Sequence, residues 1–65
     1  MMLVLTLHAK EQMVERGVSR QQVIDAIRKG SKVVQTDGFL ATYSYIKVAY
    51  KIVGEKYIVK TVMIR

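Results

Sequence analysis

The fold of this chain depends on one stretch, His8-Ala9-Lys10-Glu11-Gln12-Met13-Val14-Glu15-Arg16-Gly17. Its apolar residues recur at a helical spacing, which predicts a helix with one apolar side. Thr6 precedes the stretch as an N-cap, because its side-chain oxygen can accept an amide proton of the first turn. Gly17 ends the helix by tolerating a left-handed backbone. We therefore predict a helix over residues 7–16.

A polar row runs along this helix beside the apolar side. His8, Gln12 and Arg16 stand at positions i, i+4 and i+8, so their side chains lie one above the other. The row is the first place in the chain where reactive or anion-binding groups are brought together.

A second helix is predicted over residues 20–29. Ser19 and Gln22 form a capping box, in which each side chain accepts a backbone proton of the other residue. Val23, Ile24 and Ile27 fall on one arc of this helix. Gly30 ends it.

From Ser31 onward the hydrophobic pattern has period two, which predicts strands. The tight turns are expected at Asp37-Gly38 and Gly54-Glu55. The predicted β segments are residues 32–36, 39–53 and 56–64, and residues 2–5 are a candidate short first strand. The parity of the large side chains changes near Tyr45, which predicts a β-bulge at Tyr45-Ile46 or a longer hairpin loop.

The turn at Gly54-Glu55 fixes the register of the last two segments, because a slip of one residue would exchange their faces. The predicted pairs are Val53 with Lys56, Ile52 with Tyr57, Tyr50 with Val59, Val48 with Thr61, and Ile46 with Met63. We expect the helices to cover the face that carries these even-numbered residues of the first segment. The other face is expected to carry Lys47, Ala49, Lys51 and Val53 beside Lys56, Ile58, Lys60 and Val62.

These patterns predict an α+β fold, with two N-terminal helices packed on one face of a three- or four-stranded antiparallel sheet. With 65 residues, residues 1–65 are expected to form a single domain, since a second core could not be enclosed. A core of this size gives little stability, so a homodimer is an open alternative.

Composition restricts the chemistry. The net charge is +6, and there is one histidine and no cysteine. The excess of positive charge favours polyanions, such as RNA or an acidic protein, although a soluble protein with solvated lysines has the same composition. The lack of cysteine fits a cytoplasmic protein. No signal peptide or membrane helix is recognised, and no Walker loop or metal cluster is present, so we expect no membrane contact and no cofactor.

The motif H-A-x-x-x-M-x-x-R-G-V-S, at residues 8–19, resembles a small family of domains of unknown function. The signature of that family is H-A-x-x-R-M-x-x-R-G, followed by Ile or Val and then Ser or Thr. The resemblance extends from Thr6 to about Val62. Gln12 stands where many members have arginine. The family is similar in architecture to the RelE-like and BrnT-like toxins, small ribonucleases of toxin–antitoxin pairs, and such a similarity implies a fold before it implies an activity.

The candidate nucleic-acid-binding residues are Lys47, Lys51, Lys56, Lys60, Tyr43 and Tyr45. The lysines would hold phosphates, and the tyrosines would stack on bases at the end of the same face. The alternative is a solvated sheet face, on which lysines discourage edge-to-edge association.

The candidate catalytic residues are His8, Arg16 and Thr61. A histidine exchanges protons near neutral pH, and an arginine binds phosphate through two hydrogen bonds. Thr61 matches the end of the family motif and, in the predicted register, would meet His8 under the sheet. Each residue also has a structural alternative: His8 as a capping or core residue, Arg16 in an ion pair with Glu15 or Asp25, and Thr61 as a core threonine.

Together these features predict a small cytoplasmic protein that contacts RNA or another polyanion and has a toxin-like fold, with an RNase toxin as its enzymatic form. A toxin would also need an acidic, antitoxin-like protein partner. The alternative is a non-enzymatic module that binds an acidic protein or itself through Ile58, Val62 and Ile64. Whether the chain is an enzyme is left open by its sequence.

Overall fold

The sheet has five strands and is mixed, whereas three or four antiparallel strands were predicted. The computed structural model describes residues 1–65 and contains two helices. The strands are β1 (Met2–Leu5), β2 (Ser31–Gln35), β3 (Gly38–Tyr43), β4 (Ile46–Val53) and β5 (Lys56–Ile64). Their order is β1-β5-β4-β3-β2, and β1 is parallel to β5 while all other neighbours are antiparallel. The α+β class is confirmed, and the number and direction of the strands are corrected.

The extra strand comes from a turn inside the long segment 39–53. Tyr43 pairs with Ile46, so Ser44-Tyr45 is a tight turn, and Ser44 adopts a positive φ of 57°. The change of parity near Tyr45 is therefore a reversal of the chain, and the bulge predicted at Tyr45-Ile46 is wrong. The hairpin between β2 and β3 likewise turns one residue earlier than predicted, because Gln35 pairs with Gly38.

The register of β4 and β5 is confirmed next to the Gly54-Glu55 turn and is wrong farther from it. The pairs of Val53, Ile52 and Tyr50 are as predicted. A β-bulge then follows, because Tyr50 pairs with Val59 but Ala49 pairs with Thr61, which leaves Lys60 as the extra residue. Beyond the bulge, Val48 pairs with Val62 and Ile46 with Ile64. The bulge thus brings Val62 into the core and moves Thr61 to the opposite face.

The core lies between α2 (Arg20–Lys29) and the sheet, and it contains the three β4 residues predicted to be there. Ile46, Val48 and Tyr50 are all buried. The other buried apolar residues are Ala9, Val18, Val23, Ala26, Ile27, Ala41, Val59 and Val62. Valine, isoleucine and alanine dominate this set, as is typical of strands packed against a helix.

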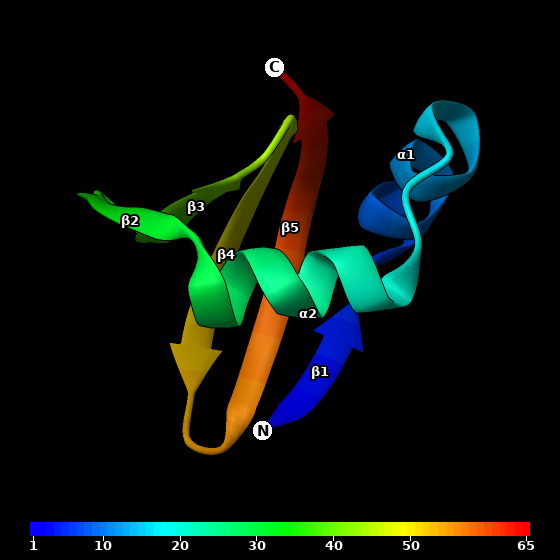
Figure 1. Cartoon of the computed structure of the whole chain (residues 1–65). Helices are drawn as coiled ribbons and strands as arrows, with labels where there is room; N and C mark the ends of the chain where they lie inside the picture. The colour runs from blue at the N-terminus through cyan, green and yellow to red at the C-terminus, as the bar shows by residue number, and fades with distance from the viewer.

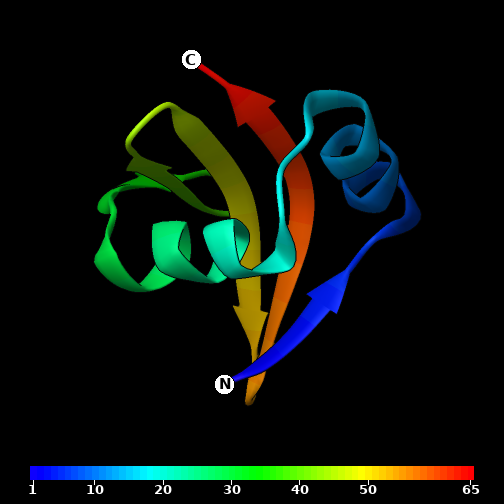
Figure 2. The ribbon, with the colours of Figure 1, turned by 45° about the vertical axis from the view of Figure 1, so that its right-hand side comes forward.

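The two helices occupy different positions on the sheet. α2 packs across β3 and β4, whereas α1 (Leu7–Arg16) packs on β5, beside the part of that strand that β1 does not reach. Figures 1 and 2 show α2 in front of the long strands and α1 beside the upper half of β5, with no helix behind the sheet. We predicted that both helices cover one face of the sheet. Only α2 does so, while α1 lies along β5. Neither helix is long and apolar enough to cross a membrane.

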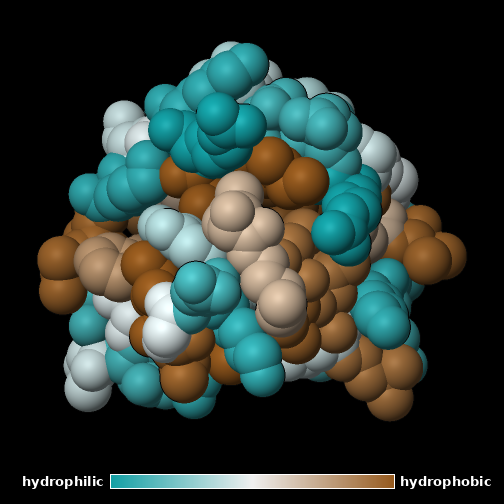
Figure 3. All heavy atoms as spheres, turned by 90° about the horizontal axis from the view of Figure 1, so that it is seen from below, coloured by the Kyte–Doolittle hydropathy of each residue, from teal (hydrophilic) through white to brown (hydrophobic).

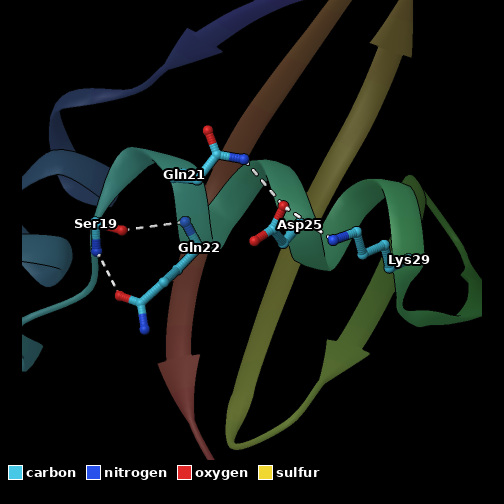
Figure 4. A network of polar contacts seen from close by, with 5 residues as sticks. All are labelled: Ser19, Gln21, Gln22, Asp25 and Lys29. Carbon is cyan, nitrogen blue, oxygen red and sulfur yellow. Dashed lines mark hydrogen bonds and ion pairs between the residues drawn. The ribbon is translucent and has the colours of Figure 1, made fainter.

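The helix caps follow the sequence signals. The Thr6 side chain accepts a hydrogen bond from the Ala9 amide, and Gly17 is left-handed with φ 65°. The Ser19 hydroxyl accepts from the Gln22 amide at 3.1 Å, and the Gln22 side chain accepts from the Ser19 amide at 2.8 Å (Figure 4). The predicted capping box is confirmed, and it fixes where α2 begins over the sheet.

Candidate functional site

Four lysines lie on the face of the sheet that no helix covers. Lys47 and Lys51 alternate with the buried residues of β4, and Lys56 stands on the same side of β5 as Ile58. Lys60 joins them at the bulge. We call this surface, made of Lys47, Lys51, Lys56, Lys60 and the side chains between them, the lysine face. The predicted register placed these four lysines on one face, and they remain on one face despite the bulge.

The ground between these lysines is largely apolar. Leu40, Ala49 and Ile58 occupy neighbouring positions on β3, β4 and β5, and all three are half-buried. Val62, which was also predicted here, is fully buried in the core instead. Lysines on an apolar surface provide both positive charge and contact area, because their methylene chains lie against that surface.

Lys60 has an anionic partner. Its Nζ donates to the backbone oxygen of Asp37 and lies 3.6 Å from the Asp37 carboxylate. Asp37 is in the turn between β2 and β3, so the Lys60 side chain crosses β4 over the lysine face. The other three lysines of this face form no ion pair. Asp37 is therefore the one carboxylate that neutralises part of this surface.

The two tyrosines do not lie beside the lysines. Tyr43 pairs with the buried Ile46, which places it on the side of the sheet that carries α2. The Tyr45 hydroxyl accepts a hydrogen bond from the Gln22 side chain at 3.0 Å. The predicted position of these tyrosines at the end of the lysine face is therefore wrong, because the chain turns at Ser44-Tyr45.

The polar row of α1 is anchored to the sheet by its middle member. Gln12 is buried, and its side-chain oxygen accepts a hydrogen bond of 2.8 Å from the Val62 amide. His8 and Arg16 lie one turn to either side, each about 6 Å along the helix axis from Gln12. Both are exposed, and neither side chain forms a hydrogen bond or ion pair with the rest of the chain.

These positions exclude the structural alternatives for His8 and Arg16. His8 is neither a cap nor a core residue, because Thr6 is the cap and the imidazole is exposed. Arg16 does not pair with Asp25, whose carboxylate instead accepts from Gln21 at 3.0 Å and lies 3.9 Å from the Lys29 ammonium (Figure 4). Both residues are therefore available for a partner from outside the chain.

Thr61 lies on the lysine face and is half-buried there, paired with Ala49. It does not point into the core, so the predicted meeting with His8 under the sheet is wrong. The neighbouring residue, Val62, is the one that Gln12 anchors. The α1 row and Thr61 thus approach the same part of β5, and no hydrogen bond joins them.

Thr6 and Gln12 anchor α1 to β5, and neither role was predicted from the sequence. Besides capping α1, the Thr6 hydroxyl donates to the backbone oxygen of Val59 at 2.9 Å. Both side chains therefore bond to the β5 backbone near the bulge. The sequence contained one signal of this anchoring. Gln12 lies at the border of the apolar side of the first helix, where a polar side chain can reach the edge of a sheet.

A hollow of about 720 Å³ lies between α2 and the lower end of the sheet. We call it the α2 groove. Its apolar lining consists of Met1, Leu3, Ile24, Ile27, Phe39, Tyr50, Ile52 and Tyr57, and its cations are Arg20, Arg28 and Lys32. Figure 3, which views this end of the molecule, shows a hydrophobic area bordered by hydrophilic side chains.

Three aromatic rings form the floor of the α2 groove. The ring centroids of Phe39 and Tyr50 are 5.5 Å apart, and those of Tyr50 and Tyr57 are 5.9 Å apart, with both pairs stacked. Burial raises the pKa of the Tyr50 phenol above its ordinary value, and the neighbouring Tyr57 adds to the rise. The phenol therefore stays protonated and neutral at physiological pH.

Ile58, Val62 and Ile64, which were predicted to form the interface of a non-enzymatic module, do not lie on one surface. Ile58 is on the lysine face, Val62 is buried, and Ile64 pairs with Ile46 on the opposite side of the sheet. No three histidine, aspartate or glutamate side chains gather where they could hold a metal ion.

A protein-family model, described as "Domain of unknown function (DUF4258)", matches residues 5–64. The match includes both helices, β2 to β5 and the end of β1. No curated protein and no solved structure matches the chain.

Proposed function

This chain belongs to the DUF4258 family of domains of unknown function, and we propose that it contacts RNA through its lysine face. The observation that supports this proposal is the placement of Lys47, Lys51, Lys56 and Lys60 on one uncovered face, with only Asp37 in an ion pair there. Like charges gathered on a sheet are unfavourable unless an anion lies between them. A phosphate backbone supplies such anions at regular spacing.

The RNA that fits this face would be held by its backbone. The tyrosines predicted to stack on bases are turned to the other side of the sheet, so the contacts left are phosphates with lysines and sugars or bases with apolar side chains such as Leu40 and Ile58. Phosphate contacts position a nucleic acid but carry no sequence information. We therefore propose binding with little sequence preference.

The test is the affinity for a single-stranded oligouridine, measured by fluorescence anisotropy at several salt concentrations. Three phosphate contacts, from the lysines without an ion pair, give a slope of about −2 in a plot of log affinity against log salt. The double variant Lys47→Gln/Lys51→Gln should weaken binding and reduce the slope to about −0.7. The matched control is Lys10→Gln/Lys29→Gln, which removes the same charge from the exposed surfaces of the helices.

Two results would remove the proposal. One is an affinity that stays flat between low and moderate salt. The other is an equal loss in the control and the lysine-face variants, because the binding would then depend on net charge and not on this face.

The enzymatic form of the proposal is an RNase with a toxin-like fold. It assigns proton transfer to His8, phosphate binding to Arg16 and a contact with the scissile nucleotide to Thr61. What supports it is the exposure of His8 and Arg16 without partners, next to the part of β5 that carries Thr61. The similarity to RelE-like and BrnT-like toxins favours it as well.

This form is tested by incubating the protein with RNA and comparing His8→Ala with the wild type. Because His8 is exposed, the substitution should change the free energy of unfolding by less than about 0.5 kcal/mol. An RNase requires that the wild type cleaves and that the folded His8→Ala variant does not. A wild type that binds RNA and leaves it intact would restrict the function to binding.

A further inference from the structure

We infer that the α2 groove binds an acidic amphipathic segment of a partner protein. This groove lies on the side of the sheet opposite the lysine face, so the inference does not depend on RNA binding. It rests on the shape of the groove, its apolar floor and the charges at its rim.

The groove leaves apolar side chains in solvent at one end of the molecule. Ile52 and Met1, both in its lining, are 43% and 57% exposed. The volume of about 720 Å³ is large enough for several side chains of a partner. Exposed apolar side chains that continue into a hollow indicate a surface that is covered in a complex.

The floor of the groove fits aliphatic side chains better than nucleobases. Tyr50 stacks on Phe39 and on Tyr57 and is only 2% exposed, so the faces of its ring are not accessible. A base would need a free ring face for stacking. The occupied faces therefore favour insertion of side chains such as leucine over the rings.

The rim cations specify the charge of the partner. Arg20 and Arg28 form no ion pair, and no aspartate or glutamate lines the groove. These arginines are eight residues apart on α2, which separates them by about 12 Å along the helix axis. Lys32 lines the same groove, and its Nζ donates to the backbone oxygen of Gly30, directly after α2. A partner with carboxylates at both ends of an apolar stretch would neutralise all three.

A second copy of this chain does not match this pattern. Each copy has a net charge of +6, so pairing two grooves would bring arginines of the same sign together. An acidic partner gains attraction from the same charges that oppose self-association.

The probe is a fluorescein-labelled helical peptide of about 15 residues, with leucines at i, i+3, i+4 and i+7 and glutamates at both ends. Its matched control has lysine in place of each glutamate. The acidic peptide should bind and the basic peptide should bind at least about tenfold more weakly, as measured by anisotropy.

Variants locate the binding site on the protein. Ile52→Asn and the double variant Arg20→Gln/Arg28→Gln should each weaken peptide binding about tenfold, by removing apolar contact and charge respectively. The control is Lys47→Gln/Lys51→Gln on the lysine face, which should leave peptide binding within about twofold. If Ile52→Asn does not fold, the arginine variant decides, since both arginines are exposed.

Four outcomes would overturn the inference. The first is peptide binding that is unchanged in the groove variants, and the second is binding that is lost in the lysine-face control. The third is a wild-type dimer that Ile52→Asn dissociates, which would make a second copy the occupant. The fourth is oligouridine that competes with the peptide and loses affinity through Ile52→Asn, which would assign the groove to nucleic acid.

Discussion

The two faces of the sheet use the same strands for opposite purposes. On β4, Val48 and Tyr50 are buried under α2, while Lys47, Ala49 and Lys51 alternate with them on the uncovered face. The first face is apolar and makes the fold stable. On the second face, Lys47, Lys51 and Lys60 are half-buried and Lys56 is exposed. Three of these four lysines form no ion pair, so they add little to stability and are free to meet an anion. Because side chains alternate between the two faces, every second residue of β4 contributes to the stable core, and the residues between them are left for binding.

The largest effect should come from putting a lysine on each face in turn. Val48→Lys buries an ammonium among apolar side chains and should cost about 4 kcal/mol or more, enough to unfold a domain of this size. Ala49→Lys, one residue away, should change the free energy of unfolding by less than about 1 kcal/mol. Urea unfolding followed by circular dichroism measures both. Similar losses at the two positions would contradict the assignment of the faces.

A smaller effect is expected where α1 is anchored to β5. Gln12→Ala removes the acceptor of the Val62 amide and leaves that buried N–H unpaired, at a cost of about 1–3 kcal/mol. Gln21→Ala is the control, because Gln21 is exposed and bonds only to Asp25 within α2. We expect the control to stay within about 0.5 kcal/mol of the wild type in the same unfolding experiment. Equal stability of both variants would mean that Gln12 does not hold α1 in place.

How far the sequence predicts this fold depends on whether the signal is local. Thr6, Ser19 and Gly54 act on their immediate neighbours, so the caps and the last hairpin follow from the sequence. The bulge at Lys60 has no such local signal. The side chains that bond to the β5 backbone on either side of it, Thr6 and Gln12, are 50 or more residues away in the sequence. One extra residue there was enough to exchange the predicted faces of Thr61 and Val62.

The candidate site was predictable in part for the same reason. Alternation along β4 places Lys47 and Lys51 on one face regardless of the bulge. The α2 groove was not foreseen, since Phe39, Tyr50 and Tyr57 come from three strands and meet only when the sheet is assembled.

The free energy of unfolding should depend on pH through Tyr50, which is buried on the α2 side of the sheet. Because the folded-state pKa of Tyr50 is raised, its neutral phenol is favoured by the fold, and this stability is lost as pH rises above the ordinary tyrosine range near 10. Tyr50→Phe should therefore lose less stability between about pH 9 and pH 11 than the wild type. Thermal unfolding at these pH values checks it, with the exposed Tyr43→Phe as the control. Identical pH profiles for the wild type and Tyr50→Phe would show that Tyr50 does not contribute.

The smallest effect concerns the ion pair on the lysine face. Asp37→Asn removes the carboxylate that neutralises Lys60 and should raise the affinity for oligouridine about two- to threefold at low salt. Stability should fall by less than about 1 kcal/mol, because the pair is solvent-exposed. The control is Glu55→Gln, which changes the net charge equally but removes no ion pair. The same gain from both variants would assign the effect to net charge.

The most direct test of the division between the two faces is lysine acetylation with and without oligouridine, followed by mass spectrometry. RNA contact through the uncovered face predicts that Lys47, Lys51 and Lys56 are acetylated more slowly in the complex, while Lys10 and Lys29 on the helices react at unchanged rates. Protection of the helix lysines, or equal protection of all five, would contradict it.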